Sequence, residues 1–319
     1  MKCLREFSLP LFVVAMGISI AGAPVLRGDL INTNQFTLKM VLTNKVAVFT
    51  IQSPETNASG AINLLFKTNF TDSQGWTWVL RCPASQTNLV LSNLPPSQGF
   101  FMLGATNAVR PGFDAFSLPR EDDDPSTNTP LPFTINFFGA ALSNVWVNNN
   151  GNVTFDNPQS SYVPDALSHL GIRIIAPYWA DVDTRDAGSD VVKFGANTVN
   201  GHDAFGVDWV NVGYFSMHTD RLLSCQLVII DRSDIAPGDF DMEFNYDRVE
   251  WEWGDANQTD TAPRAGFSNG TDDYELPGSG LAGTFPDLNA VTGLIYNHST
   301  NSIVPGRYFF PFRNGQPLP

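Results

Sequence analysis

Hydrophobic and polar positions alternate along most of this chain with the two-residue period of β-strands. In the first third, Gln35–Met40 and Val46–Ile51 alternate on either side of a Thr-Asn-Lys turn, which predicts a hairpin. Strand-like runs continue to Leu91 with no helical pattern between them. We therefore predict that residues 29–104 form a small all-β module of the sandwich or partial-barrel type.

The remainder of the chain contains longer strand patterns. Val145–Phe155 places two apolar alternations around Asn-Asn-Gly-Asn, whose residues tolerate positive φ, and this is the strongest hairpin signal. Leu222–Asp231 is nearly continuous in apolar residues and is predicted to be a central strand covered on both faces. Phe240–Tyr246 alternates strictly, which predicts one face in the core and one acidic face in water.

These patterns predict an all-β protein with two β-sandwich or β-barrel-like domains and little helix. Residues 105–112 lack periodicity and end in Pro-Gly, as expected of a linker, and residues 113–315 form the second domain. Only Asp165–Ile172 and Ala256–Ala262 have the pattern of single helical turns. Scarce charged residues, at 16%, together with abundant Gly, Pro and Phe agree with this fold class.

The first 23 residues have the pattern of a secretory signal peptide. A basic start with Lys2 and Arg5 precedes the apolar run Leu9–Ala23, which is shorter than the roughly 20 residues of a membrane span. A retained N-terminal anchor is the alternative. Cleavage would remove a net charge of +1 and change the formal charge from −14 to −15, leaving no integral membrane segment. Such an acidic chain is not expected to bind nucleic acid or anionic lipid.

The predicted mature chain has two cysteines, Cys82 and Cys225. Each is in phase with apolar residues of its own predicted strand, and the two strands belong to different domains. We favour two separately buried thiols, with a disulfide as the alternative because exported proteins often contain one.

The segment Ile174–Gly188 is the sharpest candidate site. A buried strand runs through Pro and two aromatics into a loop with Asp181, Asp183 and Asp186, whose carboxylates could bind calcium, with Asp122–Asp124 as further ligands. The spacing does not fit an EF-hand. The favoured interpretation is a structural corner in which Arg185 pairs with an aspartate; a contact with a partner is the third alternative. The run Glu121–Asp124 is predicted to be a solvated loop.

Nothing in the sequence indicates catalysis, so we predict that the protein is not an enzyme and has no cofactor other than a possible Ca²⁺. A glycosidase needs two facing carboxylates, and Asp241, Glu243, Glu250 and Glu252 could formally supply them. Strand alternation generates such carboxylates without any selection for chemistry. The tryptophans at positions 76, 78, 251 and 253 are predicted to face the core rather than to form a sugar-binding platform.

Several short sequence motifs in residues 113–312 resemble those of the nidogen extracellular (NIDO) domain. The most specific is IIAPYWADVDTRDAG, because proline, two aromatics and alternating aspartates rarely combine by chance. The animal matrix proteins with this domain usually flank it with cysteine-rich or EGF-like modules, which this sequence lacks. The other motifs are LPREDDD (118–124), INFFG (135–139), VWVNNNGNVTF (145–155), LVIID (227–231), MEFNYDRVEWEWG (242–254) and AGFSNGTDDYELPGS (265–279).

The resemblance implies a secreted, non-catalytic protein of cell–matrix or cell–surface adhesion. Its partner would be an extracellular-matrix or cell-surface protein or a glycan. The location would be extracellular or at the cell surface, or the periplasm if the source is bacterial. The alternative function is that of a carbohydrate-active protein, either a lectin-like binder or a glycoside hydrolase.

Overall fold

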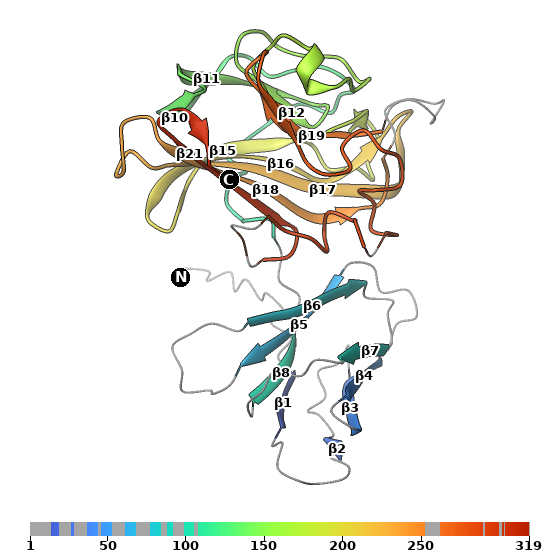
Figure 1. Ribbon diagram of the computed structural model, residues 1–319. Helices are drawn as coiled ribbons and strands as arrows, with labels where there is room; N and C mark the ends of the chain where they lie inside the picture. The colour runs from blue at the N-terminus through green and yellow to red at the C-terminus, as the bar shows by residue number, and fades with distance from the viewer. Residues whose placement is uncertain are drawn as a thin grey trace, which may run out of the picture. The chain divides into compact units, whose positions relative to one another are not determined.

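The chain divides into two compact units, Met1–Thr106 and Asn107–Pro319, and each is described by itself (Figure 1). The structure is a computed structural model; it describes residues 108–252, 262–289, 291–299, 302 and 304–318 in full, and in the first unit the backbone of the strands. Both units are built from antiparallel strands. Within the described residues the only helical element is the 3₁₀ turn η1 (Leu167–His169), and none of their helices has the length and apolar character needed to cross a membrane. The predicted all-β fold class is confirmed.

The first unit contains two four-stranded antiparallel sheets. The predicted hairpin around the Thr-Asn-Lys turn is present, with Thr43 paired to Val46. Strand β1 lies inside the predicted signal peptide and pairs with β8. The side chains of Cys82 and of the tryptophans at 76 and 78 lie outside the described residues. The sheets are β1 (Val14–Ile18), β8 (Gly99–Gly104), β5 (Ala61–Lys67) and β6 (Thr77–Pro83), and β2 (Arg27–Gly28), β3 (Thr37–Thr43), β4 (Val46–Gln52) and β7 (Asn88–Leu91).

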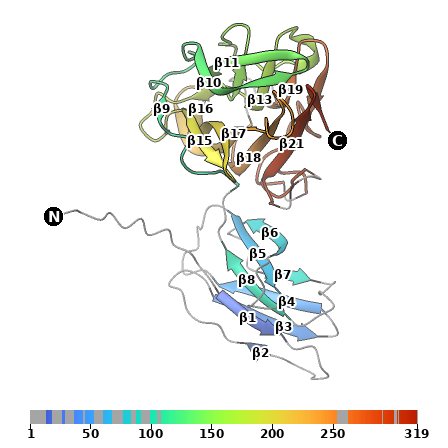
Figure 2. The same cartoon turned by 90° about the vertical axis from the view of Figure 1, so that its left-hand side faces the viewer.

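The second unit is a sandwich of a six-stranded and an eight-stranded sheet (Figure 2). The smaller sheet consists, in order, of β10 (Thr129–Phe137), β11 (Ala140–Asn148), β12 (Asn152–Thr154), β13 (Ile174–Trp179), β19 (Arg264–Ser268) and β20 (Asp273–Glu275). The larger consists of β22 (Gln316–Pro317), β21 (Arg307–Arg313), β18 (Phe240–Val249), β17 (His218–Asp231), β16 (His202–Tyr214), β15 (Lys193–Val199) and β9 (Phe116–Ser117), with β14 (Val182–Asp183) also paired to β16.

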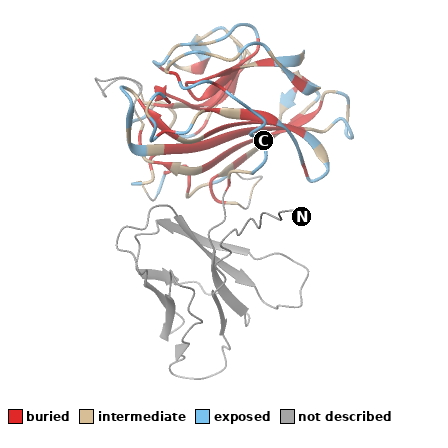
Figure 3. Ribbon diagram, turned by 180° about the vertical axis from the view of Figure 1, so that it is seen from behind, coloured by how far each residue is buried: buried red, intermediate tan, exposed pale blue. Residues whose placement is uncertain are grey.

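Aromatic side chains from both sheets form the core between them. Phe137 of the smaller sheet and Phe312 of the larger have ring centroids 5.5 Å apart, and Phe267 approaches Phe310 at 5.4 Å. Strand β17 is central, between β16 and β18, and its apolar run is buried on both faces, as predicted. Cys225 on this strand is a buried free thiol. The long strands of the larger sheet are buried over most of their length, while the loops carry the exposed residues (Figure 3).

The predicted water-facing acidic side of β18 is wrong. Asp241 and Glu243 are 3% and 2% exposed, because arginines and the segment that enters the second unit cover this face. Arg110 donates two hydrogen bonds to the Glu243 carboxylate, at 2.6 and 2.8 Å. Arg232 and Arg313 each donate to Asp241. The acidic positions are therefore internal charges neutralised by arginine rather than a solvated surface.

The segment 108–113 is attached to this polar face by side-chain hydrogen bonds. The Ala108 amide donates to Asp247 at 2.6 Å, and the Arg110 amide donates to the Gln226 side chain at 2.9 Å. Phe113 at the end of the segment is fully buried and packs over Gly206, where a Cβ atom would overlap its ring. Residues that resemble a linker in sequence thus form part of the second unit's packing.

Asp208 lies on the same face and is 9% exposed. It accepts a hydrogen bond from Gln226 at 2.7 Å, but burial raises its pKa to about 7. A buried acid with a raised pKa keeps its proton in the folded state while the unfolded chain loses it, so Asp208 lowers stability as pH rises from about 4 to about 7.

We expect Asp208→Asn to remove this loss. The difference in unfolding free energy between variant and parent should be near zero at pH 4 and should grow to as much as about 4 kcal/mol in favour of the variant at pH 8. Urea unfolding at both pH values measures it. Asp203→Asn, at an exposed position of the same strand, is the control. An equal difference at both pH values would contradict the assignment.

Candidate functional site

The Ile174–Gly188 segment is the place where the chain crosses from one sheet to the other. Strand β13 belongs to the smaller sheet and β14, three residues later, pairs with β16 of the larger one. Tyr178 and Trp179, which precede the crossing, are 0% and 1% exposed. The Tyr178 hydroxyl donates to the Trp251 carbonyl at 2.6 Å, and the Trp179 indole donates to the Ser161 carbonyl at 2.8 Å. The packed aromatic corner predicted from the sequence is confirmed.

The predicted 145–155 hairpin forms the wall of this corner. Val147 pairs with Val153, and its turn glycine, Gly151, has φ +73°. The turn is buried, although turns of this composition are usually at the surface. Asn150 explains the burial, because its carbonyl and side-chain oxygens accept the amides of Ala180 and Val182. The turn therefore supplies the hydrogen bonds that the crossing segment cannot make within a sheet.

Asp183 is a buried carboxylate with a structural role in the corner. It is fully buried and accepts two hydrogen bonds from the Arg185 guanidinium, at 3.0 and 2.6 Å, and one from the Met217 amide at 2.8 Å. Burial alone would raise the pKa of Asp183, but these hydrogen bonds outweigh burial and hold the pKa below its ordinary value. The same guanidinium reaches Asp122 at 2.8 Å. The interpretation of an arginine-paired corner is correct for this aspartate.

Asp186 has a local role in the turn that follows. Its carboxylate accepts the Gly188 amide at 2.7 Å. Its carbonyl, with those of Thr184 and Ser189, accepts hydrogen bonds from Arg120. The three aspartates proposed as one metal site thus have different surroundings, and the structure does not bring Asp186 together with Asp181.

Asp181 instead meets the acidic run that begins at Glu121. Carboxylate oxygens of Asp122, Asp123 and Asp181 all lie within 4.8 Å of one another. The prediction that Glu121–Asp124 is a solvated loop is wrong for Glu121, which is 8% exposed. The amide of Glu121 is held by the Thr184 hydroxyl at 3.0 Å, which draws the start of the run inward.

Burial and mutual repulsion raise the proton affinity of this group. Burial, with help from the charges of Asp124 and Asp123, raises the pKa of Glu121 to about 7. Burial and the charge of Asp183 raise the pKa of Asp122 to about 6, although Arg185 acts in the opposite direction. The corner therefore holds more negative charge than its arginine compensates.

The carboxylates considered for glycoside hydrolysis are used structurally. Asp241 and Glu243 form the arginine pairs described above. Glu250 accepts the Leu222 amide and Glu252 accepts the Gly283 amide, beside a shallow depression of about 400 Å³. Trp251 between them is 1% exposed and does not form a platform, as predicted, whereas Trp253 lies outside the described residues.

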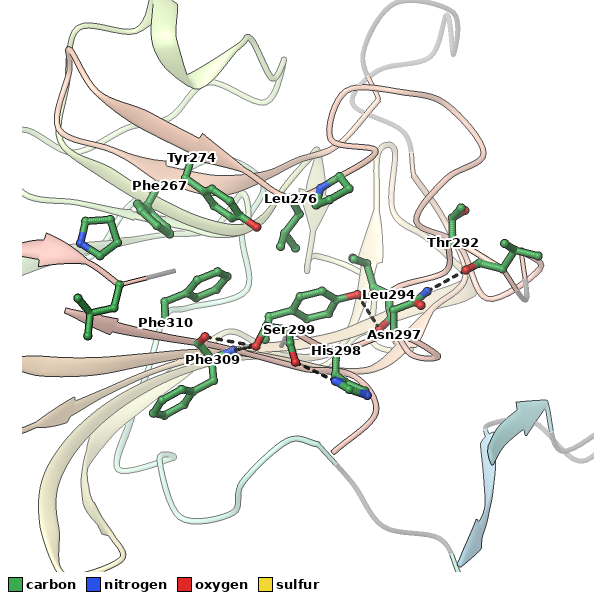
Figure 4. A pocket seen from close by; sticks show the side chains of 15 residues that line it. Phe267, Tyr274, Leu276, Thr292, Leu294, Asn297, His298, Ser299, Phe309 and Phe310 are labelled. Atoms are coloured by element: carbon green, nitrogen blue, oxygen red, sulfur yellow. Dashed lines mark hydrogen bonds between the residues drawn. The ribbon is translucent and has the colours of Figure 1, made fainter. Parts of the chain in front are cut away.

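An apolar groove of about 620 Å³ lies between the edge strand β20 and strands β21 and β22 (Figure 4). Aromatic rings form its interior, with Tyr274 and Phe310 centroids 5.5 Å apart. Val291 and Leu318 at its margin are 80% and 46% exposed. Asn297, His298 and Ser299 contribute polar groups along one side. No motif in the sequence predicts this groove, because its residues come from five separated segments.

Comparison with known proteins gives one family. A family model described as "Nidogen-like domain" matches residues 143–314, more than half of the chain. Mouse and human alpha-tectorin are each 28% identical to the chain over 222 and 227 residues, which is 60% of this chain and 10% of those proteins. Drosophila nidogen is 26% identical over 228 residues, 62% of this chain and 16% of the relative. The chain therefore spans about a tenth of the length of the tectorins. No solved structure matches.

Proposed function

Because the chain belongs to the family of proteins with a nidogen-like domain, we propose that it is a secreted, non-catalytic recognition protein of cell–matrix or cell–surface adhesion. The named relatives, alpha-tectorin and nidogen, match the same region and support this function. The predicted signal peptide supports export, to the extracellular space or, in a bacterium, to the periplasm. The partner would be an extracellular-matrix or cell-surface protein, with a glycan as the alternative.

The observation that carries the proposal is the apolar groove beside β20. Soluble proteins seldom leave a concave apolar surface with several exposed aliphatic side chains unless it binds something. Its margin is formed by Val291 and Leu318, and its floor by aromatic rings, which dominate the energetics of protein interfaces. A protein partner that inserts an apolar side chain fits this surface, because its exposed margin is aliphatic.

A binding screen of the mature chain against matrix proteins, cell-surface proteins and a glycan array tests the proposal. We expect a protein partner whose affinity falls about tenfold or more in Val291→Asp, because a carboxylate would be desolvated in an apolar contact. Leu281→Asp is the matched control, since Leu281 is 63% exposed and does not line the groove.

Two results would count against the proposal. Binding of glycans alone would support the carbohydrate-binding alternative. A protein partner bound equally well by the parent and by Val291→Asp would place the recognition surface elsewhere.

A further inference from the structure

We infer that the acidic corner binds one calcium ion through oxygens of Asp122, Asp123 and Asp181, with the side chain of Asn149 completing the site. This proposal is independent of the adhesion partner. This set of ligands replaces the predicted set of Asp181, Asp183 and Asp186. Asp183 accepts hydrogen bonds from Arg185, and Asp186 accepts the backbone amide of Gly188 in the local turn.

The acidic cluster alone would not establish a metal site, since exposed carboxylates often gather without one. The further observation is a set of buried oxygens without hydrogen-bond partners. Among the described side chains, four buried polar atoms lack a partner, and three are oxygens of this corner; the fourth is a nitrogen of Arg264. The three oxygens are Oε1 of Glu121, Oδ1 of Asp122 and Oδ1 of Asn149. A buried oxygen without a hydrogen-bond partner is unfavourable, so the unpaired oxygens of Asp122 and Asn149 indicate a missing electropositive partner.

Asn149 is held beside the acidic run. Its side chain is completely buried, and its amide nitrogen donates to the carbonyl of Asp122 and, at 2.5 Å, to that of Val182. The side-chain amide is thus held between the acidic run and the residue next to Asp181. Its unpaired oxygen shares an amide carbon with this nitrogen and is therefore held close to the backbone of Asp122.

Arg185, the cation of the corner, pairs with only one carboxylate of this cluster. Arg185 reaches Asp183 and one oxygen of Asp122, Oδ2, which leaves Oδ1 of Asp122 as the buried oxygen without a partner. Asp123 accepts a hydrogen bond from the side-chain amide of Asn150 at 2.8 Å, and this hydrogen bond orients the carboxylate without neutralising it. The carboxylates of the cluster offer only oxygen donors.

The donor chemistry selects calcium over other metals. Carboxylate and amide oxygens are hard ligands, and no histidine or cysteine belongs to the described cluster, so zinc and copper are disfavoured. Calcium accepts six to eight oxygens in irregular geometry, whereas magnesium requires a near-octahedral set and retains several waters. Ligands drawn from two loops and a hairpin turn fit the irregular arrangement. Extracellular calcium modules have dissociation constants of about 10⁻⁴–10⁻³ M, which suits an exported protein.

Thermal unfolding of the full mature chain in 10 mM CaCl₂ and in EDTA tests the site. We expect calcium to raise the Tm of the second unit by about 3–10 °C, from mass action at that affinity and the size of the unit. The same concentration of MgCl₂ should give less than a third of that shift. Calorimetric titration with CaCl₂ should give one ion per chain.

Asp123→Asn should abolish most of the calcium-dependent shift, while an asparagine oxygen can still accept the Asn150 amide. Asp124→Asn is the matched control, because Asp124 lies in the same acidic run, is exposed and is outside the cluster. An identical Tm in CaCl₂ and EDTA would overturn the site. An equal response to magnesium would overturn the assignment to calcium, and an equal response of Asp123→Asn and the parent would place the ion elsewhere.

Discussion

Replacement of Gly151 by alanine is expected to destabilise the second unit by about 2–5 kcal/mol. Two costs add: the left-handed φ of +73° costs an alanine about 1–2 kcal/mol, and the new Cβ would overlap the Tyr178 carbonyl, whose carbon lies 2.6 Å away. The Tyr178 carbonyl cannot move away freely, because the backbone amide of the same residue donates a hydrogen bond to the Gly151 carbonyl at 3.1 Å. Chemical denaturation measures the loss in unfolding free energy, which is a large part of the whole stability of many domains.

Gly139→Ala separates the two costs. Gly139 has φ +86°, but nothing lies within 4 Å of the position of its added Cβ. This variant should lose only about 1–2 kcal/mol from backbone strain. Equal losses in the two variants would show that the contact between the hairpin turn and the crossing strand is not tight.

The second large effect is expected for Arg110→Ala, at about 3 kcal/mol. The change leaves the Glu243 carboxylate, 3% exposed in its side chain, without its two-point partner. Burial alone would raise the pKa of Glu243, yet Arg110 and Arg307 hold it below its ordinary value, so the group is charged and needs compensation. Arg307, at 3.5 Å, provides part of it, which keeps the loss at the lower end for broken buried pairs.

Arg173→Ala serves as the comparison. Arg173 pairs with Asp156 at the surface, where both side chains are more than a third exposed. Exposed pairs contribute about 0–1 kcal/mol, so this variant should unfold at nearly the parent's denaturant concentration. If Arg110→Ala behaved in the same way, the attachment of residues 108–113 to the sheet would be energetically unimportant.

The fold class, the long strands and the aromatic corner follow from local patterns in the sequence. A two-residue period identifies a strand wherever one face is apolar, and the Val145–Phe155 hairpin was predictable because its turn chemistry is local. The motifs that resemble the NIDO domain also depend only on residues near one another in the chain. These features require no knowledge of what packs against them.

Which charges are buried and which carboxylates meet depends on contacts between residues far apart in the chain. The alternation of Phe240–Tyr246 is the same whether water or arginine covers the polar face, so the burial of Glu243 depends on Arg110, 133 residues away. Asp181 lies within 4.8 Å of Asp122 and Asp123, and Asp183 is paired with Arg185, which also reaches Asp122. The chain crosses between sheets at this point, and the crossing brings both side chains to an acidic run that lies far away in the sequence. Long-range contacts of this kind leave no periodic signal in the sequence.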